Sequence, residues 1–252
     1  MKISVVTISY NQKKYLHQCI DSILGQTDCD LEYIVVDPGS TDGSRELIES
    51  YGDRIIKLFA PDKGPADGLN QGFKLATGDV YGFINSDDYL LPDALSHVNR
   101  YFSTKGLGYF VTGQGYTEDA QGQHLRIHPQ KLTAQTMLHR SAVMFQQATF
   151  FSAQSFKDVG GFNTENDTCW DYELFLRFLL NGVQHEVIPQ DLAAFRLHDQ
   201  SISGTGRLNE RYFKELDKLF TEILKRERGV TDKVLTCYLR VKRELLRRLG
   251  VV

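Results

Sequence analysis

Residues 80–88 are Val80-Tyr81-Gly82-Phe83-Ile84-Asn85-Ser86-Asp87-Asp88, an apolar run that ends in polar residues and two acids. The apolar part, Val80–Ile84, predicts a buried strand. A helix is predicted on each side of it: Pro65–Ala76 upstream, and a downstream helix that Pro92 is suited to open. A strand between two helices, with acids at its carboxyl end, indicates an α/β fold whose ligands gather at that end.

The sequence before this unit repeats the alternation. It predicts three more strands and two more helices: strands Ile3–Ile8, Leu31–Val36 and Ile55–Phe59, and helices Lys13–Gln26 and Ser44–Tyr51. Short connections between such elements favour a mostly parallel central sheet flanked by helices. The polar residues that follow each strand mark the edge where a site is expected.

The second half of the chain is less regular. We expect a strand pair over 109–116 and 124–128, a strand over 148–152, helix Trp170–Leu180, and two short strands over 184–189 and 193–197. From Arg207 onward the pattern is helical, with a break at Gly229. These patterns predict a domain over 1–205 and a C-terminal helical extension over 206–252.

Composition excludes several classes of protein. The 252 residues include 29 basic and 32 acidic ones, with 41% hydrophobic residues, which is typical of a globular protein rather than a disordered one. The near-neutral charge argues against nucleic acid as a partner. No apolar run approaches the roughly 18 residues that span a bilayer, and Ile3–Ile8 is too short for a signal peptide. Four cysteines without C-x-x-C spacing then predict reduced thiols in a cytoplasmic protein.

Two phosphate-binding signatures are absent from the sequence. No G-x-G-x-x-G follows the first strand, and no G-x-x-x-x-G-K followed by Ser or Thr occurs anywhere. These absences disfavour a dinucleotide-dependent dehydrogenase and a P-loop nucleotidase despite the α/β pattern.

Three clusters of acidic or histidine residues have both a structural and a chemical interpretation. Asp87 and Asp88 either cap the next helix or offer the oxygen ligands that Mg²⁺ and Mn²⁺ prefer beside substrate phosphates. Asp171, at a predicted helix start, is either an N-cap or a general base that reaches an acceptor hydroxyl. His198 is either a surface or core histidine or a nitrogen ligand that Mn²⁺ accepts. The residues alone leave these alternatives open.

Eight segments in a fixed order carry a resemblance that covers about residues 1–200. They are Val5–Asn11, Ser22–Thr27, Val35–Ser44, Asp62–Gly72, Ala76–Asp79, Asn85–Asp88, Val159–Phe162 and Asp171–Glu173. In this order they resemble the family-two glycosyltransferases of the GT-A fold. The resemblance implies a nucleotide-binding half over 1–104 and an acceptor half over 105–205.

The resemblance also implies an activity. It is inverting transfer of a sugar from a nucleotide-diphosphate sugar, with UDP favoured, to a hydroxyl of a growing or lipid-linked glycan in cell-envelope polysaccharide biosynthesis. Mn²⁺ or Mg²⁺ would be the cofactor. An alternative stays open: a nucleotide-sugar-binding or scaffolding subunit with little activity of its own.

Carried over residue by residue, the resemblance implies a role for each matching position. Asp171 would be the catalytic base, and Asp87, Asp88 and His198 would bind the metal. The nucleotide sugar would contact Thr7, Ser9, Tyr10, Asp37, Lys63, Asp67, Asn85, Ser86 and Asp87. Gln147 and Trp170 would face the acceptor. The chain departs from the family pattern at Pro38, which replaces a second Asp, and at Asn85, where many members have the first Asp of Asp-x-Asp.

Charge is unevenly distributed along the chain. From Arg207 to the end there are 13 basic and 7 acidic residues, which leaves 16 basic and 25 acidic ones in the body. The last helix carries an apolar stripe of Val234, Tyr238, Val241, Leu245 and Leu249 beside basic residues such as Arg240 and Lys242. Such a helix either packs on the body or on a second copy in a homodimer, or contacts anionic lipid at the inner face of the cell membrane.

Overall fold

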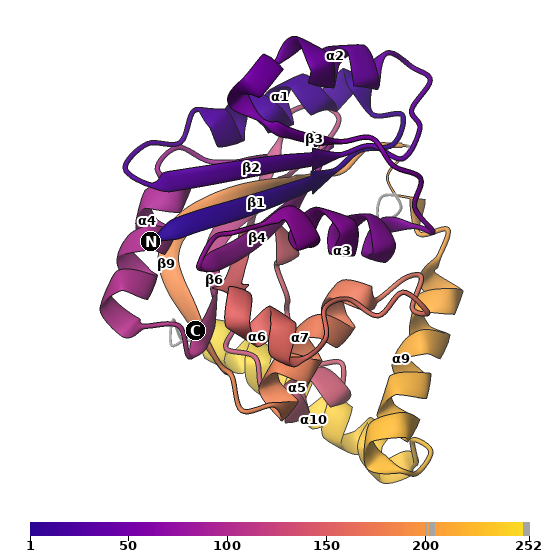
Figure 1. Cartoon of the computed structure of the whole chain (residues 1–252). Coiled ribbons are helices and arrows are strands. Elements are labelled where there is room, and N and C mark those ends of the chain that lie inside the picture. Colours follow the sequence, from indigo (N-terminus) through magenta and orange to yellow (C-terminus); the bar gives the residue numbers. More distant parts are fainter. Residues whose placement is uncertain (200, 202–204, 249–252) are drawn as a thin grey trace.

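The computed structural model describes residues 1–199, 201 and 205–248. Nine strands of this described part form one mixed sheet in the order β3-β2-β1-β4-β8-β6-β9-β5, with β7 paired to β6 (Figure 1). The strands are β1 Lys2–Ile8, β2 Asp30–Val36, β3 Ile56–Leu58, β4 Val80–Asn85, β5 Tyr89–Leu90, β6 Tyr109–Glu118, β7 His124–Ile127, β8 Thr149–Ser152 and β9 Gln184–Arg196.

Helices cover both faces of the sheet (Figure 1). They are α1 Lys13–Leu24, α2 Ser44–Ser50, α3 Pro65–Leu75, α4 Ala94–Lys105, α5 Ala134–Leu138, α6 Ala153–Asp158, α7 Trp170–Leu180, α9 Asn209–Leu224 and α10 Val230–Arg248. Alternate residues of β1 face opposite layers, because side chains on a strand point to opposite faces in turn. Val5 packs in the core with residues of α1 and α4, whereas Val6 packs with residues of α3.

The first half forms the parallel sheet that the sequence predicts. β1 pairs in parallel with β2 and β4, and β2 pairs in parallel with β3. The carboxyl ends of β1, β2 and β4 therefore lie side by side along one edge. This confirms the predicted α/β architecture and places Asp37 and Asp87 after β2 and β4, the two strands that flank β1.

The second half adds antiparallel pairs. β8 runs antiparallel to both β4 and β6, while β9 runs parallel to β6 and antiparallel to β5. Gly82 of β4 permits this packing, because a Cβ there would lie 2.4 Å from the Phe150 ring of β8. The two short strands expected over 184–189 and 193–197 are one strand, β9, with a register irregularity opposite Gln114.

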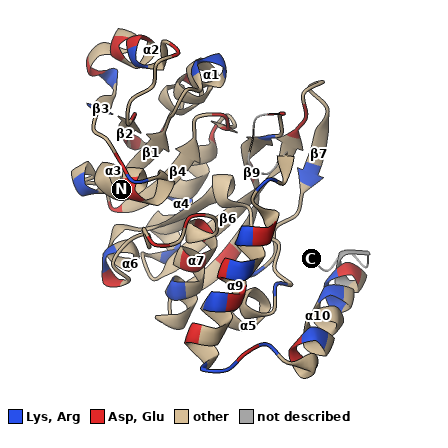
Figure 2. Ribbon diagram, turned by 90° about the vertical axis from the view of Figure 1, so that its right-hand side faces the viewer, with Lys and Arg blue, Asp and Glu red and all other residues tan. Residues whose placement is uncertain are grey.

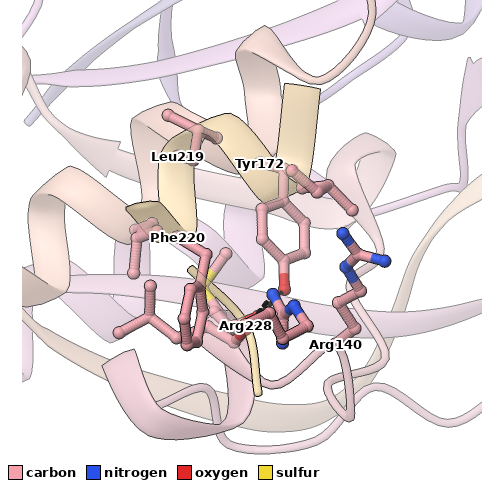
Figure 3. A pocket seen from close by; sticks show the side chains of 9 residues that line it. Arg140, Tyr172, Leu219, Phe220 and Arg228 are labelled. Carbon is pink, nitrogen blue, oxygen red and sulfur yellow. Dashed lines mark hydrogen bonds between the residues drawn. The ribbon is translucent and has the colours of Figure 1, made fainter. Parts of the chain in front are cut away.

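The C-terminal helices pack against the second half of the body. Leu216, Leu219 and Phe220 of α9 are buried in the core that α7 shares. Arg140 and Arg228 line a small cavity beside Tyr172 and Phe220 (Figure 3), and the Arg228 guanidinium lies 4.1 Å from the centre of the Phe220 ring. Leu249, expected at the end of the α10 stripe, lies outside the described residues. Within residues 1–199, 201 and 205–248, no helix has the length and apolar character needed to cross a membrane.

Candidate active site

The carboxyl ends of β4 and β9 bring one aspartate and one histidine together. Asp87 Oδ2 lies 3.1 Å from His198 Nε2, although 111 residues separate them in the sequence. The His198 ring lies against Tyr15 of α1, with ring centroids 4.6 Å apart. Asp87 retains 17% exposure of its side chain and His198 retains 4%, so the pair borders the surface.

This pair fits a hard divalent cation as two of its ligands. Neighbouring ligands of an octahedral ion with bonds of about 2.1 Å lie about 3 Å apart, close to the spacing of the Asp87 and His198 atoms. In the described part of the chain, no three His, Cys, Asp or Glu side chains gather as a metal cluster. A cation here would need the remaining ligands from water and from a bound diphosphate, which is common for Mg²⁺ sites.

Asp88 faces away from this pair into the protein. Its Oδ1 accepts a hydrogen bond from the backbone N–H of Arg196 at 2.9 Å, and its Oδ2 accepts one from Gln147 Nε2 at 3.0 Å. Burial and the neighbouring Asp87 charge raise the pKa of the Asp88 carboxyl well above its usual range. Asp88 was expected at the metal and Gln147 on the acceptor side. In the structure, the side-chain amide of Gln147 donates a hydrogen bond to the Asp88 carboxylate, so each residue uses a polar group to bind the other.

Arg196 connects the surrounding elements, a role that was not predicted although it lies two residues before His198. Its Nη1 donates to the Asp87 carbonyl at 2.8 Å, and its Nη2 donates to Gln18 Oε1 of α1 at 2.6 Å. The guanidinium lies between the rings of Tyr15 and Tyr89, 4.9 and 5.2 Å from their centres. It fixes the Asp87 backbone against α1.

After β2, Asp37 is fully buried with its two oxygens in different states. Oδ1 accepts hydrogen bonds from the N–H groups of Gly39 and Ser40, at 2.9 and 2.8 Å, and from Arg45 Nε at 3.1 Å. Oδ2 is buried and has no hydrogen-bond partner within the described protein atoms, and the same holds for Ser9 Oγ at the end of β1. Unpaired buried acceptors cost free energy unless a donor comes from outside the chain, as a ligand would supply.

The other positions expected at the nucleotide sugar are spread along this edge and beyond it. Thr7 is fully buried, and its hydroxyl accepts a hydrogen bond from Tyr33 at 3.0 Å, inside the core. Tyr10 is 61% exposed. Asp67 Oδ2 accepts from the backbone N–H of Lys63 at 3.0 Å, which orders the start of α3. Asn85, the last residue of β4, is half-buried, and Ser86, which follows it, is buried.

Asp171 occupies the first turn of α7. Its Oδ1 accepts a hydrogen bond from the N–H of Tyr172 at 2.7 Å, and burial raises the pKa of its carboxyl to about 6. The preceding Trp170 packs its ring 5.7 Å from that of Phe83, two residues before the end of β4. The base candidate thus begins a helix that is docked beside the strand carrying Asp87.

The loop before Asp171 is held by a residue that no pattern in the sequence pointed to. Glu215 of α9 accepts a hydrogen bond from the N–H of Thr168 at 2.9 Å and another from the Thr168 hydroxyl. Arg211, one turn earlier on α9, pairs with both Asp167 and Glu215. The helical extension therefore contacts the segment that leads into α7.

The chain matches known proteins over most of its length. The description of the matching family is glycosyl transferase family 2, and the match covers residues 4–160. An uncharacterized glycosyltransferase of Nostoc sp. is 41% identical over 108 residues, which is 41% of this chain and 34% of the relative. Chondroitin synthase of Pasteurella multocida is 30% identical over 185 residues, which is 69% of this chain and 18% of that enzyme. The chain thus spans about a third of the Nostoc protein and less than a fifth of the synthase.

Solved structures show the same fold. TarS 1-349 of S. aureus in complex with UDP-GlcNAc superposes with a TM-score of 0.72 at 18% identity, over 96% of this chain and 71% of that one. The mannosyltransferase PcManGT from Pyrobaculum calidifontis, in complex with GDP-Man and Mn²⁺, gives 0.68 at 14% identity, over 99% and 71%. The strand-end site and this shared architecture agree with the family match: the chain belongs to glycosyl transferase family 2.

Proposed function

We propose that this glycosyltransferase moves a sugar from UDP to a hydroxyl of a glycan, with inversion at the anomeric carbon, in a reaction that depends on Mn²⁺ or Mg²⁺. The observation that carries the proposal is the meeting of Asp87 and His198 at the ends of β4 and β9. A carboxylate and an imidazole at 3.1 Å, on the edge where α/β sheets bind ligands, suit a cation that also holds a diphosphate.

The nucleotide is expected at the ends of β1 and β2. The unpaired Oδ2 of Asp37 is an acceptor, so it suits a base that presents an N–H at its pairing edge. The ring N–H of uracil, thymine or guanine meets this requirement. Adenine and cytosine offer an N–H only from their exocyclic amino group, because their ring nitrogens at this edge are acceptors. UDP is our choice among the three because of the family resemblance, and TarS, a structural neighbour, was solved with UDP-GlcNAc.

Asp171 is our choice of general base. With a pKa of about 6, the carboxylate is ionised at neutral pH and is more basic than an exposed aspartate, which suits proton removal in the transition state. The acceptor oxygen would lose its proton to Asp171 and form the new bond on the face of the sugar opposite the diphosphate. The bond between the anomeric carbon and the diphosphate breaks at the same time, so the configuration at this carbon inverts.

A bound cation would supply charge neutralisation for the leaving diphosphate, and Asp87 and His198 are the residues that would hold it. Arg196 keeps Asp87 in place through its carbonyl, and Trp170 anchors the start of the helix that carries the base. Gln147 donates a hydrogen bond to Asp88. It would therefore affect the acceptor only indirectly, by keeping the residues around Asp88 rigid. The acceptor would be a cell-envelope glycan, free or lipid-linked.

One experiment tests the proposal directly. The purified protein is incubated with a panel of UDP-, GDP-, dTDP- and ADP-sugars, with Mn²⁺, with Mg²⁺ or with EDTA, and released nucleoside diphosphate is measured. We expect release from a UDP-sugar with either cation and none with EDTA. Tight nucleotide binding without any release, on the panel and with added glycan acceptors, would instead favour a binding subunit.

A further inference from the structure

We propose that α10 docks this protein on an anionic lipid surface through an apolar stripe with basic flanks, and this holds whichever sugar the enzyme transfers. The stripe consists of side chains that are 55–75% exposed: Val230, Val234, Tyr238, Val241 and Leu245. At about 100° per residue they fall within an arc of about 80° on the helix. A continuous exposed apolar stripe of this kind marks an interaction surface.

The opposite side of α10 faces the body, which explains why the stripe points outward. Arg243 Nη1 donates to the Ser141 carbonyl at 2.7 Å, and Arg240 Nε donates to the Arg140 carbonyl at 3.1 Å. Asp232 is buried and forms a two-bond ion pair with Arg226 of the segment between α9 and α10, at 2.6 and 2.8 Å, which fixes the start of the helix. Polar groups thus fasten the helix to the body, and the apolar groups are left for a partner.

The charged residues beside the stripe indicate which kind of partner fits it. Lys242 borders one side of the stripe and Lys233 the other, and both are exposed. The acids of the described part of α10 are Asp232, which is buried and paired, and Glu244, which is half-buried on the Lys233 side of the stripe and has a partner. Figure 2 shows basic residues spaced along α10. A face of apolar residues between cations matches a bilayer with negative headgroups, and Tyr238 at its centre suits the boundary between headgroups and acyl chains.

A second copy of the chain fits this face less well. Two α10 helices packed stripe to stripe would bring the lysines of both copies to the same seam, where like charges repel. An anionic lipid surface instead attracts both lysines while it buries the stripe.

Vesicle co-sedimentation of the whole chain tests the proposal, with vesicles of phosphatidylcholine alone and of phosphatidylcholine with 30% phosphatidylglycerol. We expect binding to the anionic vesicles that weakens in high salt and at least tenfold weaker binding to the neutral ones. Lys233→Glu with Lys242→Glu should reduce the partition coefficient at least tenfold. The same charge change on α9, Lys214→Glu with Lys218→Glu, should reduce it far less.

The apolar part has its own matched pair of variants. Val234→Ser with Val241→Ser should abolish vesicle binding, whereas Leu125→Ser with Leu180→Ser removes apolar groups of similar exposure elsewhere and should leave binding intact. All four variants alter exposed side chains, so circular dichroism should show unchanged folding. Wild-type protein that ignores anionic vesicles, or that forms a dimer which the Val234 and Val241 changes dissociate, would overturn the proposal. Loss of nucleotide-sugar turnover in a variant that still binds vesicles would bear on the proposed function alone.

Discussion

The carboxylates at the two ends of β2 differ in whether all of their oxygens accept hydrogen bonds. Near its start, Glu32 is buried with four hydrogen bonds, from Lys2 Nζ, Ser4 Oγ, Thr77 Oγ1 and the Thr77 N–H, at 2.6–2.7 Å. Burial alone would raise the pKa of Glu32, but these donors outweigh it and lower the pKa to about 2. After the end of the strand, Asp37 keeps one oxygen without any partner in the described part of the protein.

Asp171 resembles Asp37 and not Glu32 in this respect. It accepts one backbone hydrogen bond and has a pKa raised to about 6 by burial. A carboxylate whose oxygens are all bonded within the fold stabilises the fold, whereas one with free acceptor capacity costs stability until a ligand or proton arrives. The contrast shows that the hydrogen-bond donors around a carboxylate distinguish a structural carboxylate from one available to a ligand better than its burial does.

The largest effect should come from Asp171→Asn. An amide cannot take the acceptor proton, so we expect kcat to fall about a thousandfold, while UDP binding by calorimetry stays within about threefold. In the wild-type enzyme, kcat should fall as pH drops through about 6, where Asp171 becomes protonated. Near-normal turnover in this variant would assign the base elsewhere.

The same substitution should stabilise the protein. The Asp171 pKa of about 6 in the folded state exceeds the 3.8 of the unfolded chain, so ionisation disfavours folding. The cost is absent below pH 3.8, grows between pH 3.8 and 6, and is constant above pH 6. Urea unfolding at pH 8 should therefore show the variant to be more stable by about 1 kcal/mol, since partial solvation reduces the effect, with no gain near pH 3.5.

Glu32→Gln should give the reverse pattern. Loss of the charge that Lys2, Ser4 and Thr77 bond should lower the free energy of unfolding by about 2 kcal/mol at pH 7, with nucleotide affinity unchanged. The folded-state pKa lies below the unfolded value of 4.5, so the contribution of Glu32 is present above pH 4.5 and lost as pH falls toward 2. A clear loss of UDP affinity would contradict the distinction between a structural carboxylate near the start of β2 and a ligand-binding carboxylate after its end.

Asp87→Ala should weaken nucleotide binding about thirtyfold in the presence of Mn²⁺ and hardly at all in EDTA, because the carboxylate would act through the cation. Calorimetric titration of UDP under both conditions measures this directly. Asp79→Ala is a matched control, since Asp79 lies at the amino end of β4 and accepts a hydrogen bond from the Lys2 N–H. Equal losses with and without Mn²⁺ would argue against a metal-linked role.

The smallest effect on nucleotide binding among the site variants should come from Asp37→Asn. An amide in place of the carboxylate can present an N–H to the base, so we expect UDP affinity to fall about tenfold and discrimination against CDP to shrink. Competition binding with UDP and CDP measures both. Asp30→Asn, at the exposed start of β2, is a control that should change neither value.

Much of the fold follows from sequence periodicity, because strand and helix patterns are local. The predicted bounds of α7 coincide with the observed Trp170–Leu180, and the predicted strands of the first half end within one residue of those observed. Strand direction in the second half was not predictable, since no local signal says that β8 runs antiparallel between β4 and β6. The two short strands expected over 184–189 and 193–197 form one strand, because pairing with β6 continues across the register irregularity opposite Gln114.

The site was predictable only in part, because tertiary contacts decide which way a side chain faces. Asp87 and Asp88 are adjacent in sequence, yet one borders His198 and the other is enclosed by Arg196 and Gln147. The family resemblance implied a nucleotide contact for Thr7, whereas its hydroxyl accepts a hydrogen bond from Tyr33 in the core. Arg196 lies beside the predicted ligand His198, and Glu215 lies in a segment without any motif. Only contacts with distant elements show a role for either.

The long separation between Asp87 and His198 has a consequence for biosynthesis. A ribosome adds roughly 5–20 residues per second, so the 111 residues between the two positions take on the order of 5–20 s to make. The β1–β4 region emerges first, and His198 follows only after β9, which must then pair with β6. A nascent or truncated chain therefore lacks half of the proposed cation pair. The enzyme becomes able to grip a diphosphate in this way only when its last strand is in place.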